Sequence, residues 1–198
     1  MTSTGPRADQ ARSSGPEHRT RAELEAGLDH VRASPRDAGS LAWIVRRPAE
    51  GEREVVDSGE LTQEQGLVGD NWGARHNRHA PDGTPDPDKQ LNLMNARAVD
   101  LVAGARERWA LAGDQLYVDF DLGEENAPPG TRLALGDTAV VEVTPPPHLG
   151  CKKFKQRFGV EAMRFFNSPA GSALNLRGVN ARVVTPGTVR VGDVVRKL

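Results

Sequence analysis

The chain has 198 residues, with 26 Lys and Arg against 27 Asp and Glu, and a single cysteine. One cysteine excludes an intramolecular disulfide framework and any multi-thiolate metal site within one chain. The formal net charge of −1 argues against a general nucleic-acid binder, and no apolar run reaches the roughly 18 residues of a membrane span. We therefore expect a soluble cytoplasmic protein of one domain, with no nucleic-acid or membrane partner.

The chain is predicted to begin with a polar tail and a helix. Residues 1–17 contain almost no apolar side chains, which is typical of a disordered tail. A helix is predicted over about 20–33, because Thr20 and Glu23 form a capping box ahead of an apolar stripe. The ordered domain is then expected to span 18–198.

Short apolar runs between Gly, Pro and Asp residues predict strands in the rest of the chain. These runs are 41–45, 53–57, 91–94, 116–122, 132–135, 138–144, 180–185 and 188–195. Two more helices are predicted over 96–111, capped by Asn95, and over 160–167. Thr62 is expected to cap a short helical turn, and 73–88 is expected to be a long surface loop. Many short strands with few helices favour a mainly β fold, a small barrel or closed sheet.

Charge is unevenly distributed along the chain. Residues 145–182 hold seven cations and one anion, so this segment carries +6 and the remainder carries −7. Cys151 lies inside the basic segment, where nearby cations favour the thiolate that ligates soft metals or carries sulfur. Cys151 is therefore the candidate catalytic residue and metal ligand, and the alternative is an inert buried thiol. His148, three residues earlier, either serves as its base or only caps and packs locally.

Basic and polar side chains around Cys151 predict a site for a phosphate group, since Lys and Arg bind phosphate through charge-assisted hydrogen bonds. The candidates are Lys152, Lys153, Arg157, Asn167, Ser168, Asn175 and Arg177, with Asp70 as a further hydrogen-bonding residue. The alternative is a solvated basic face. The phenylalanines in this part of the chain are expected in the core: Phe154, Phe158, Phe165 and Phe166.

The 73–88 loop contains histidines and aspartates that could resemble the ligands of a metal site. His76 and His79 are followed by Asp82, Asp86 and Asp88, but His-x-x-His without a Glu-bearing zinc motif is a weak signal. We expect this loop to be mainly solvated.

Several motifs occur in an order that is known from one family. They are Gly66-Leu-Val-Gly-Asp70, Leu135-Gly-Asp137 followed by Val140-Val-Glu-Val-Thr144, Cys151-Lys-Lys-Phe154, and Arg190-Val-Gly-Asp193. From about Leu41 to Leu198 the chain resembles the MOSC domain family, named for the C-terminal domain of molybdenum-cofactor sulfurases, and in particular its bacterial stand-alone members. The resemblance implies a single-domain β-barrel. The chain departs from the family pattern at Asp119-Phe-Asp-Leu122, where many relatives have Asn-Leu. An acidic residue facing a phosphate would be unfavourable.

The resemblance also implies a function for Cys151. It matches the family's characteristic cysteine, which carries sulfur or ligates molybdenum of the pterin cofactor, molybdopterin. Some relatives reduce N-hydroxylated compounds. This implies a molybdenum-cofactor-binding reductase component that takes its electrons from a separate donor protein. The alternative is a non-catalytic sulfur-carrier or cofactor-binding module with a Cys151 persulfide, for which a cysteine desulfurase would be the partner. A third reading is an anion-binding barrel with an inert cysteine.

Overall fold

A closed, seven-stranded mixed β-barrel forms the centre of the fold in a computed structural model that describes residues 18–77 and 80–198. Around the barrel the strands follow in the order β11 (Val194–Lys197), β7 (Arg132–Leu135), β8 (Ala139–Val143), β9 (Val179–Thr185), β5 (Leu91–Asn95), β6 (Leu116–Asp119) and β1 (Ala38–Arg46). β11 pairs with β1 and closes the barrel, while β2 (Glu54–Val56) extends β1 outside it. β5 and β6 are parallel, and the other neighbours are antiparallel.

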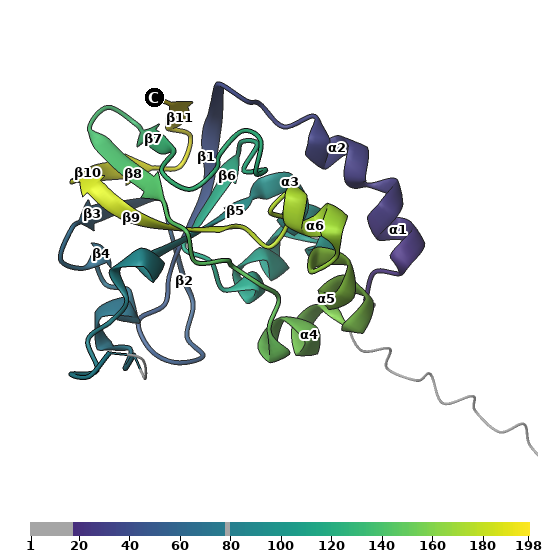
Figure 1. Cartoon of the computed structure of the whole chain (residues 1–198), viewed down its shortest axis with the longest axis horizontal. Helices are drawn as coiled ribbons and strands as arrows, with labels where there is room; N and C mark the ends of the chain where they lie inside the picture. The colour runs from purple at the N-terminus through teal and green to yellow at the C-terminus, as the bar shows by residue number, and fades with distance from the viewer. Residues whose placement is uncertain (1–17, 78–79) are drawn as a thin grey trace, which may run out of the picture.

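A small second sheet lies beside the barrel (Figure 1). Its strands are β10 (Gly187–Arg190), β3 (Ser58–Thr62) and β4 (Gly66–Leu67). β3 and β4 form a tight hairpin in which the Gln65 amide donates to the Thr62 hydroxyl. Leu61, Leu67 and Val189 from this sheet are fully buried in the barrel's core cluster. The small sheet therefore extends the hydrophobic core.

Alternation along the strands explains which side chains fill the barrel. In β8, Ala139, Val141 and Val143 are buried, while Val140 and Glu142 are more exposed, as the two-residue period of a strand requires. β1 departs from this period, because its register with β6 shifts between Leu41 and Trp43. A bulge of this kind redirects the following side chains.

The helices gather on one side of the barrel (Figure 1). They are α1 (Arg21–Ala26), α2 (Leu28–Arg32), α3 (Ala96–Ala103), α4 (Lys152–Phe158), α5 (Val160–Phe166) and α6 (Pro169–Ala173). Three 3₁₀ helices are also present in the described chain: η1 (Asn71–Ala74), η2 (Pro87–Lys89) and η3 (Arg106–Ala112). The predicted capping box of Thr20 and Glu23 forms at α1, and Asn95 caps α3 as expected. In the described part of the chain, none of the helices has the length and apolar character of a membrane span.

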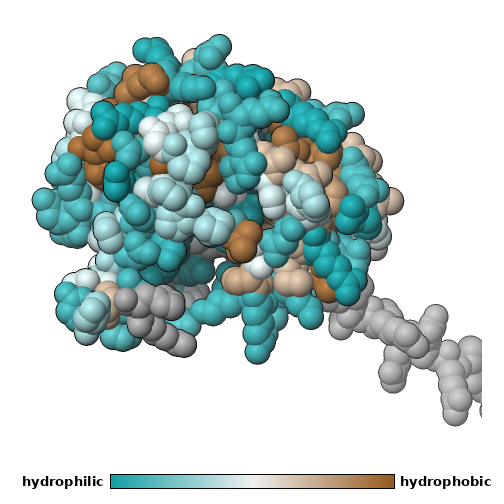
Figure 2. All heavy atoms as spheres, viewed as in Figure 1, coloured by the Kyte–Doolittle hydropathy of each residue, from teal (hydrophilic) through white to brown (hydrophobic). Residues whose placement is uncertain are grey.

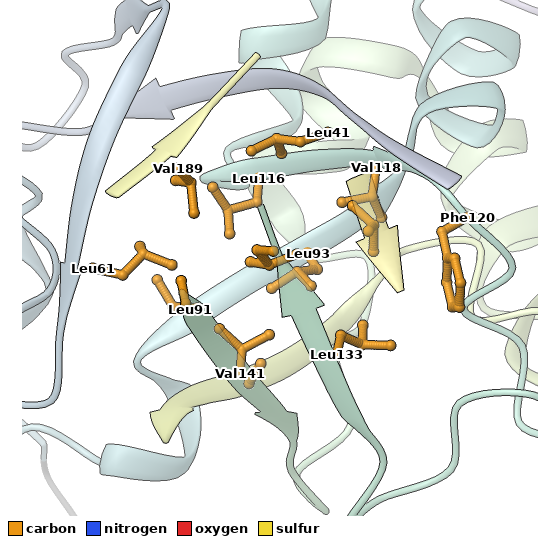
Figure 3. Close-up of a cluster of buried hydrophobic side chains, with 14 of the residues drawn as sticks. Leu41, Leu61, Leu91, Leu93, Leu116, Val118, Phe120, Leu133, Val141 and Val189 are labelled. Carbon is orange, nitrogen blue, oxygen red and sulfur yellow. The ribbon is translucent and has the colours of Figure 1, made fainter. Parts of the chain in front are cut away.

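Two hydrophobic clusters stabilise this arrangement. The first fills the barrel with aliphatic side chains such as Leu93 and Val118, and with Phe120 (Figure 3). The second joins the outer face of the barrel to the helices and contains most of the aromatic side chains, including Trp109 and Tyr117. All four phenylalanines that were expected in the core are at most 2% exposed, and they belong to this second cluster.

The predicted elements differ from the observed ones mainly where a helix is short or a glycine intervenes. The helix over 20–33 is divided at Gly27, and the helix over 96–111 becomes α3 and η3 because Gly104 adopts a left-handed conformation. The strand over 188–195 is divided into β10 and β11. Thr62 ends β3, and its hydroxyl accepts from the Gln65 amide and so caps the turn over 63–65, but this turn does not continue as a helix. The predicted tail over 1–17 lies outside the described residues.

The elements missed by the sequence prediction are β3, β4, α4 and α6, and the 3₁₀ helices η1 and η2. Each spans two to seven residues. Such short segments have too few turns or alternations for a periodic signal, and their packing against the barrel decides their conformation.

Candidate functional site

A polar cleft of about 480 Å³ lies between the segment after β1, the end of η1 and α4. Figure 2 shows the surface hollowed between the lobe at the lower left and the helices at the right, with mainly hydrophilic side chains around the hollow. The charged and polar residues that line it are Arg47, Glu50, Arg53, Asn71, Arg75, His76, Asn92, His148, Cys151, Lys153, Arg157 and Arg177. Six of these carry a full positive charge and only Glu50 is acidic, so the cleft favours anions.

Cys151 lies at the N-cap position of α4, at the edge of the cleft, and it is free and exposed. Two asparagines hold the loop that leads to it. The Gly150 amide donates to Asn167 Oδ1 over 2.8 Å, and Asn167 Nδ2 donates back to the Gly150 carbonyl over 3.1 Å. Asn180 Nδ2 donates to the Pro146 carbonyl over 2.8 Å. The thiol is therefore accessible at the end of a loop whose backbone is held at two points.

Four successive backbone carbonyls accept hydrogen bonds from arginines of the cleft. Each of residues 110–113 accepts a hydrogen bond from a different guanidinium: Arg53 Nε to Ala110 (3.2 Å), Arg157 Nη1 to Leu111 (2.6 Å), Arg177 Nη2 to Ala112 (2.9 Å) and Arg47 Nη1 to Gly113 (2.8 Å). These carbonyls are at the end of η3, where helical backbone acceptors lack partners within the helix. The segment thus places cations from four distant parts of the chain next to one another.

Arg47 is anchored by Asp70 beneath the cleft. Both side chains are almost fully buried, and Arg47 Nε and Nη2 donate to the two carboxylate oxygens over 2.7 and 2.9 Å. Asp70 also accepts from the Trp72 amide and so caps η1. Arg47 Nη1 further donates to Asn92 Oδ1, and Asn92 Nδ2 donates to Asn180. This polar chain links Arg47 to the loop that carries Cys151.

Arg177, Asp114 and His148 form a second buried group. Arg177 Nη1 donates to Asp114 Oδ2 over 2.7 Å, and His148 Nδ1 lies 3.4 Å from Asp114 Oδ1 without forming a hydrogen bond. Burial lowers the pKa of His148 well below 6.5, and the charges of Arg177 and Arg47 add to this, so the imidazole is neutral at pH 7. Burial raises the pKa of Asp114, while Arg177 opposes the shift. Arg177 Nε, Asp114 Oδ1 and His148 Nδ1 are buried and have no hydrogen-bond partner in residues 18–77 and 80–198.

Three cleft arginines make no ion pair within the part of the chain that the structure describes: Arg53, Arg75 and Arg157. Burial and the neighbouring charge of Arg157 lower the pKa of Arg53. Arg75 is exposed as a residue, but its guanidinium is partly desolvated, and this together with Arg47 lowers its pKa. Mutual repulsion of this kind is relieved when an anion binds.

The structure brings five of the predicted site residues together at the cleft: His148, Cys151, Lys153, Arg157 and Arg177. Lys153 Nζ pairs with Glu50 over 2.7 Å, but both side chains are largely exposed, so this pair contributes little and opens easily.

The other predicted residues do not line the cleft, because their side chains have local tasks or face solvent. Asp70 is occupied by Arg47, and Asn167 holds Gly150. Ser168 caps α6, and Asn175 donates to the Leu122 carbonyl at a positive φ of 44°. Lys152 is exposed on α4.

The sequence analysis missed several residues of the cleft, and these come from the N-terminal half of the chain: Arg47, Arg53, Arg75 and Asn92. They lie in segments without a charge excess, so no local pattern distinguished them. Only Arg47, which directly follows a strand and a second arginine, carried a weak signal.

The 73–88 loop and the acidic departure from the family pattern also have structural explanations. Asp86 caps η2, and Asp88 pairs with Arg182. Within residues 18–77 and 80–198, no group of three His, Cys, Asp or Glu side chains is placed to hold a metal ion, and His79 lies outside the described residues. Asp119 pairs with Arg97 and does not line the cleft, so it does not oppose an anion there.

Comparisons with known proteins agree with this architecture. Among solved structures, YuaD from Bacillus subtilis matches with a TM-score of 0.55 at 15% identity, over 81% of this chain and 95% of that one. YiiM from Escherichia coli matches with a TM-score of 0.50 at 21% identity, over 80% and 69% of the two chains. YiiM from Geobacillus stearothermophilus matches with a TM-score of 0.52 at 14% identity, over 81% and 75%. At these identities the likeness shows the fold alone.

The family is shown by a different comparison. No curated protein matches the chain. The family model described as the MOSC domain, however, matches residues 67–196, which is well over half of the sequence. The matched range contains η3, the Cys151 loop and α4, and it ends in the strand that closes the barrel. The chain therefore belongs to the MOSC domain family.

Proposed function

We propose that this protein binds a molybdenum cofactor in the arginine-lined cleft, with the Cys151 thiolate as the metal ligand. We further propose that it is a reductase component acting on N-hydroxylated compounds, with electrons supplied by a separate protein. MOSC domains are associated with molybdenum-cofactor binding generally, and the chain belongs to that family. The observation that carries the proposal is an exposed thiol at the edge of a cleft in which three guanidiniums make no ion pair with the described residues.

The donor set of the cleft fits such a cofactor. A thiolate is a soft ligand suited to a transition metal, and Cys151 is the single thiol of the chain. The phosphate of the pterin suits Arg53 and Arg157, whose guanidiniums flank Gly113. The unpartnered Nε of buried Arg177 is a further donor in the lining.

When bound, the cofactor supplies the redox chemistry. The residues of this chain supply position and charge. Asn167 and Asn180 fix the backbone that presents Cys151, while Arg47 and Arg177 stay in place because buried Asp70 and Asp114 balance them. Phe154 is only 1% exposed and lines one side of the cleft. His148 is neutral at pH 7, because burial lowers its pKa, and so it adds no charge to the cleft.

The test is metal and pterin analysis of the protein isolated from a host that makes the cofactor. We expect molybdenum and pterin to co-purify with the wild type, and Cys151→Ser to lose most of the metal while its thermal unfolding is unchanged, because the residue is exposed. Arg164→Ala, an exposed arginine outside the cleft, is the matched control and should retain both. A folded wild type without metal and pterin, or a Cys151→Ser variant that keeps its metal, contradicts the proposal.

A sulfur-carrier role is the second candidate, favoured by the accessibility of Cys151 to a donor protein. In that case Cys151 holds a persulfide, and incubation with a cysteine desulfurase and cysteine adds the mass of one sulfur atom to the intact chain. Cys151→Ser should not gain this mass. An equal gain by both proteins excludes the carrier role.

A further inference from the structure

The charge balance of the cleft exceeds what one phosphate needs. Buried Asp70 and Asp114 already match Arg47 and Arg177. Arg53, Arg75 and Arg157 make no ion pair with the described residues, and Lys153 is restrained only by a surface pair. A phosphate monoester carries a charge of about −1.5 to −2 at pH 7. One such group leaves at least one cleft guanidinium without a counter-charge.

The three arginines without an ion pair come from two parts of the cleft lining. Arg53 and Arg157 meet at Gly113, where a Cβ atom would lie 3.4 Å from Arg53 Nη2 and 3.8 Å from Arg157 Nη1. The missing side chain leaves room between the two guanidiniums. Arg75 comes from the end of η1, where its Nε donates to Asn71 Oδ1 over 3.0 Å. After burial, Arg47 is the charged group that lowers the pKa of Arg75 most, and Asp70 and Glu50 oppose it, whereas for Arg53 the corresponding group is Arg157.

Backbone and buried contacts hold these cations in place before any ligand arrives. Arg53 and Arg157 are tied to the carbonyls of residues 110 and 111, and Arg47 is held by its own carboxylate partner. Guanidiniums that are already ordered lose less conformational entropy on binding. Planar forks of this kind hold phosphate oxygens through paired hydrogen bonds.

We propose that the cleft recognises a diphosphate group, with one phosphate between Arg53 and Arg157 at Gly113 and the other held by Arg75 and by Lys153 released from Glu50. This inference deepens the proposed function, because it specifies the anionic end of the ligand. It does not depend on the metal. A diphosphate offers more oxygens and more charge than one phosphate, and it spans two neighbouring cation sites.

The test is calorimetric titration of the full-length protein, made in a host without the pterin cofactor, with phosphate and with pyrophosphate at one fixed salt concentration. We expect pyrophosphate to bind at least about tenfold more tightly than phosphate. Arg157→Ala should weaken both anions. Arg75→Ala should remove most of the preference for pyrophosphate and leave phosphate binding nearly unchanged.

The matched control is Arg164→Ala, which removes the same charge outside the cleft and should change neither affinity. Thermal unfolding of every variant verifies the fold, and Arg75→Lys should recover part of the preference, because it keeps the charge without the fork. Equal affinities of the wild type for the two anions overturn the proposal. Identical behaviour of Arg75→Ala and Arg164→Ala also overturns it.

The diphosphate can belong to a free nucleotide or to a larger cofactor. ADP that binds more tightly than AMP supports recognition of the free form, and a nucleotide released by mild acid from protein made in the cofactor-producing host supports the second source. Absence of molybdenum with a retained pyrophosphate preference refutes only the proposed function. Bound molybdenum without a preference for pyrophosphate refutes only the diphosphate site.

Discussion

At the scale of single residues, the site depends on which charges are balanced and which are not. Arg47 and Arg177 are as cationic as Arg53, but each has a buried carboxylate partner. Removing one member of such a pair leaves an uncompensated buried charge, which is strongly unfavourable. We therefore regard Arg47 and Arg177 as part of the frame of the cleft, and Arg53 and Arg157 as the side chains available to an anion.

His148 makes the stability of the protein depend on pH. Burial, Arg177 and Arg47 hold its pKa well below 6.5 in the folded state, whereas the unfolded chain titrates near that value. As the pH falls below about 6.5, the unfolded state takes up a proton that the folded state does not, so the free energy of unfolding falls by up to about 1.4 kcal/mol per pH unit. This contribution is fully present above pH 6.5 and is lost on acidification.

His148→Gln should remove that part of the pH dependence. Denaturant unfolding of both proteins between about pH 7 and pH 5 measures the difference, since the other titrating groups are shared. A steeper loss of stability in the wild type than in the variant is expected. Equal slopes would show that the imidazole titrates alike in both states.

At the scale of elements, α4 connects the chemistry to the core. One side of this seven-residue helix presents Lys153 and Arg157 to the cleft. The other side buries Phe154 and Phe158, whose ring centroids lie 4.9 Å apart. A helix this short is unstable by itself in water, so these rings hold the cations in position.

Phe158→Ala should therefore affect stability and binding together. We expect a loss of about 3–5 kcal/mol in the free energy of unfolding, because a fully buried ring is replaced by a cavity. Phosphate binding should also weaken as Arg157 loses its support. Gln156→Ala, exposed on the same helix, should stay within about 0.5 kcal/mol of the wild type. Similar losses in both variants would contradict the anchoring role of the ring.

At the scale of the whole molecule, closure of the barrel brings the cleft together. β1 pairs with β6 on one side and with β11 on the other, and Arg47 follows directly after β1. Gly39 allows the close approach of these strands, because a Cβ atom there would lie 1.9 Å from the Asp119 carbonyl oxygen. Neither neighbouring strand can shift without disturbing the barrel.

Gly39→Ala should be far more destabilising than an ordinary surface substitution. The clash is with backbone, so we expect a loss of about 3 kcal/mol or more in the free energy of unfolding. Gly73→Ala is the matched control, since a Cβ atom at Gly73 meets nothing within 4 Å, and it should change stability by less than about 0.5 kcal/mol. Chemical denaturation of both variants measures the difference, and a neutral Gly39→Ala would mean that β1 and β6 are not so closely paired.

Local chemistry in the sequence was sufficient for the class of fold and for one side of the site. Alternating apolar runs predicted the barrel strands, capping residues predicted the starts of α1 and α3, and the basic segment around Cys151 marked the half of the cleft that is contiguous in the chain. The motifs around Gly66, Gly136 and Cys151 also predicted the family. These signals are local, because periodicity, capping and charge clustering act over neighbouring residues.

The opposite wall of the cleft depends on tertiary structure. Arg53 and Arg75 belong to segments with no charge excess, and they reach the site only because the barrel closes and the carbonyls of residues 110–113 collect side chains from distant positions. Asn167 and Asp70 are polar residues in familiar motifs, yet their hydrogen bonds are used to hold a loop and a buried arginine. Whether a polar side chain binds a ligand or supports its neighbours depends on which partners the fold places within hydrogen-bond distance, and those contacts are mostly between residues far apart in the chain.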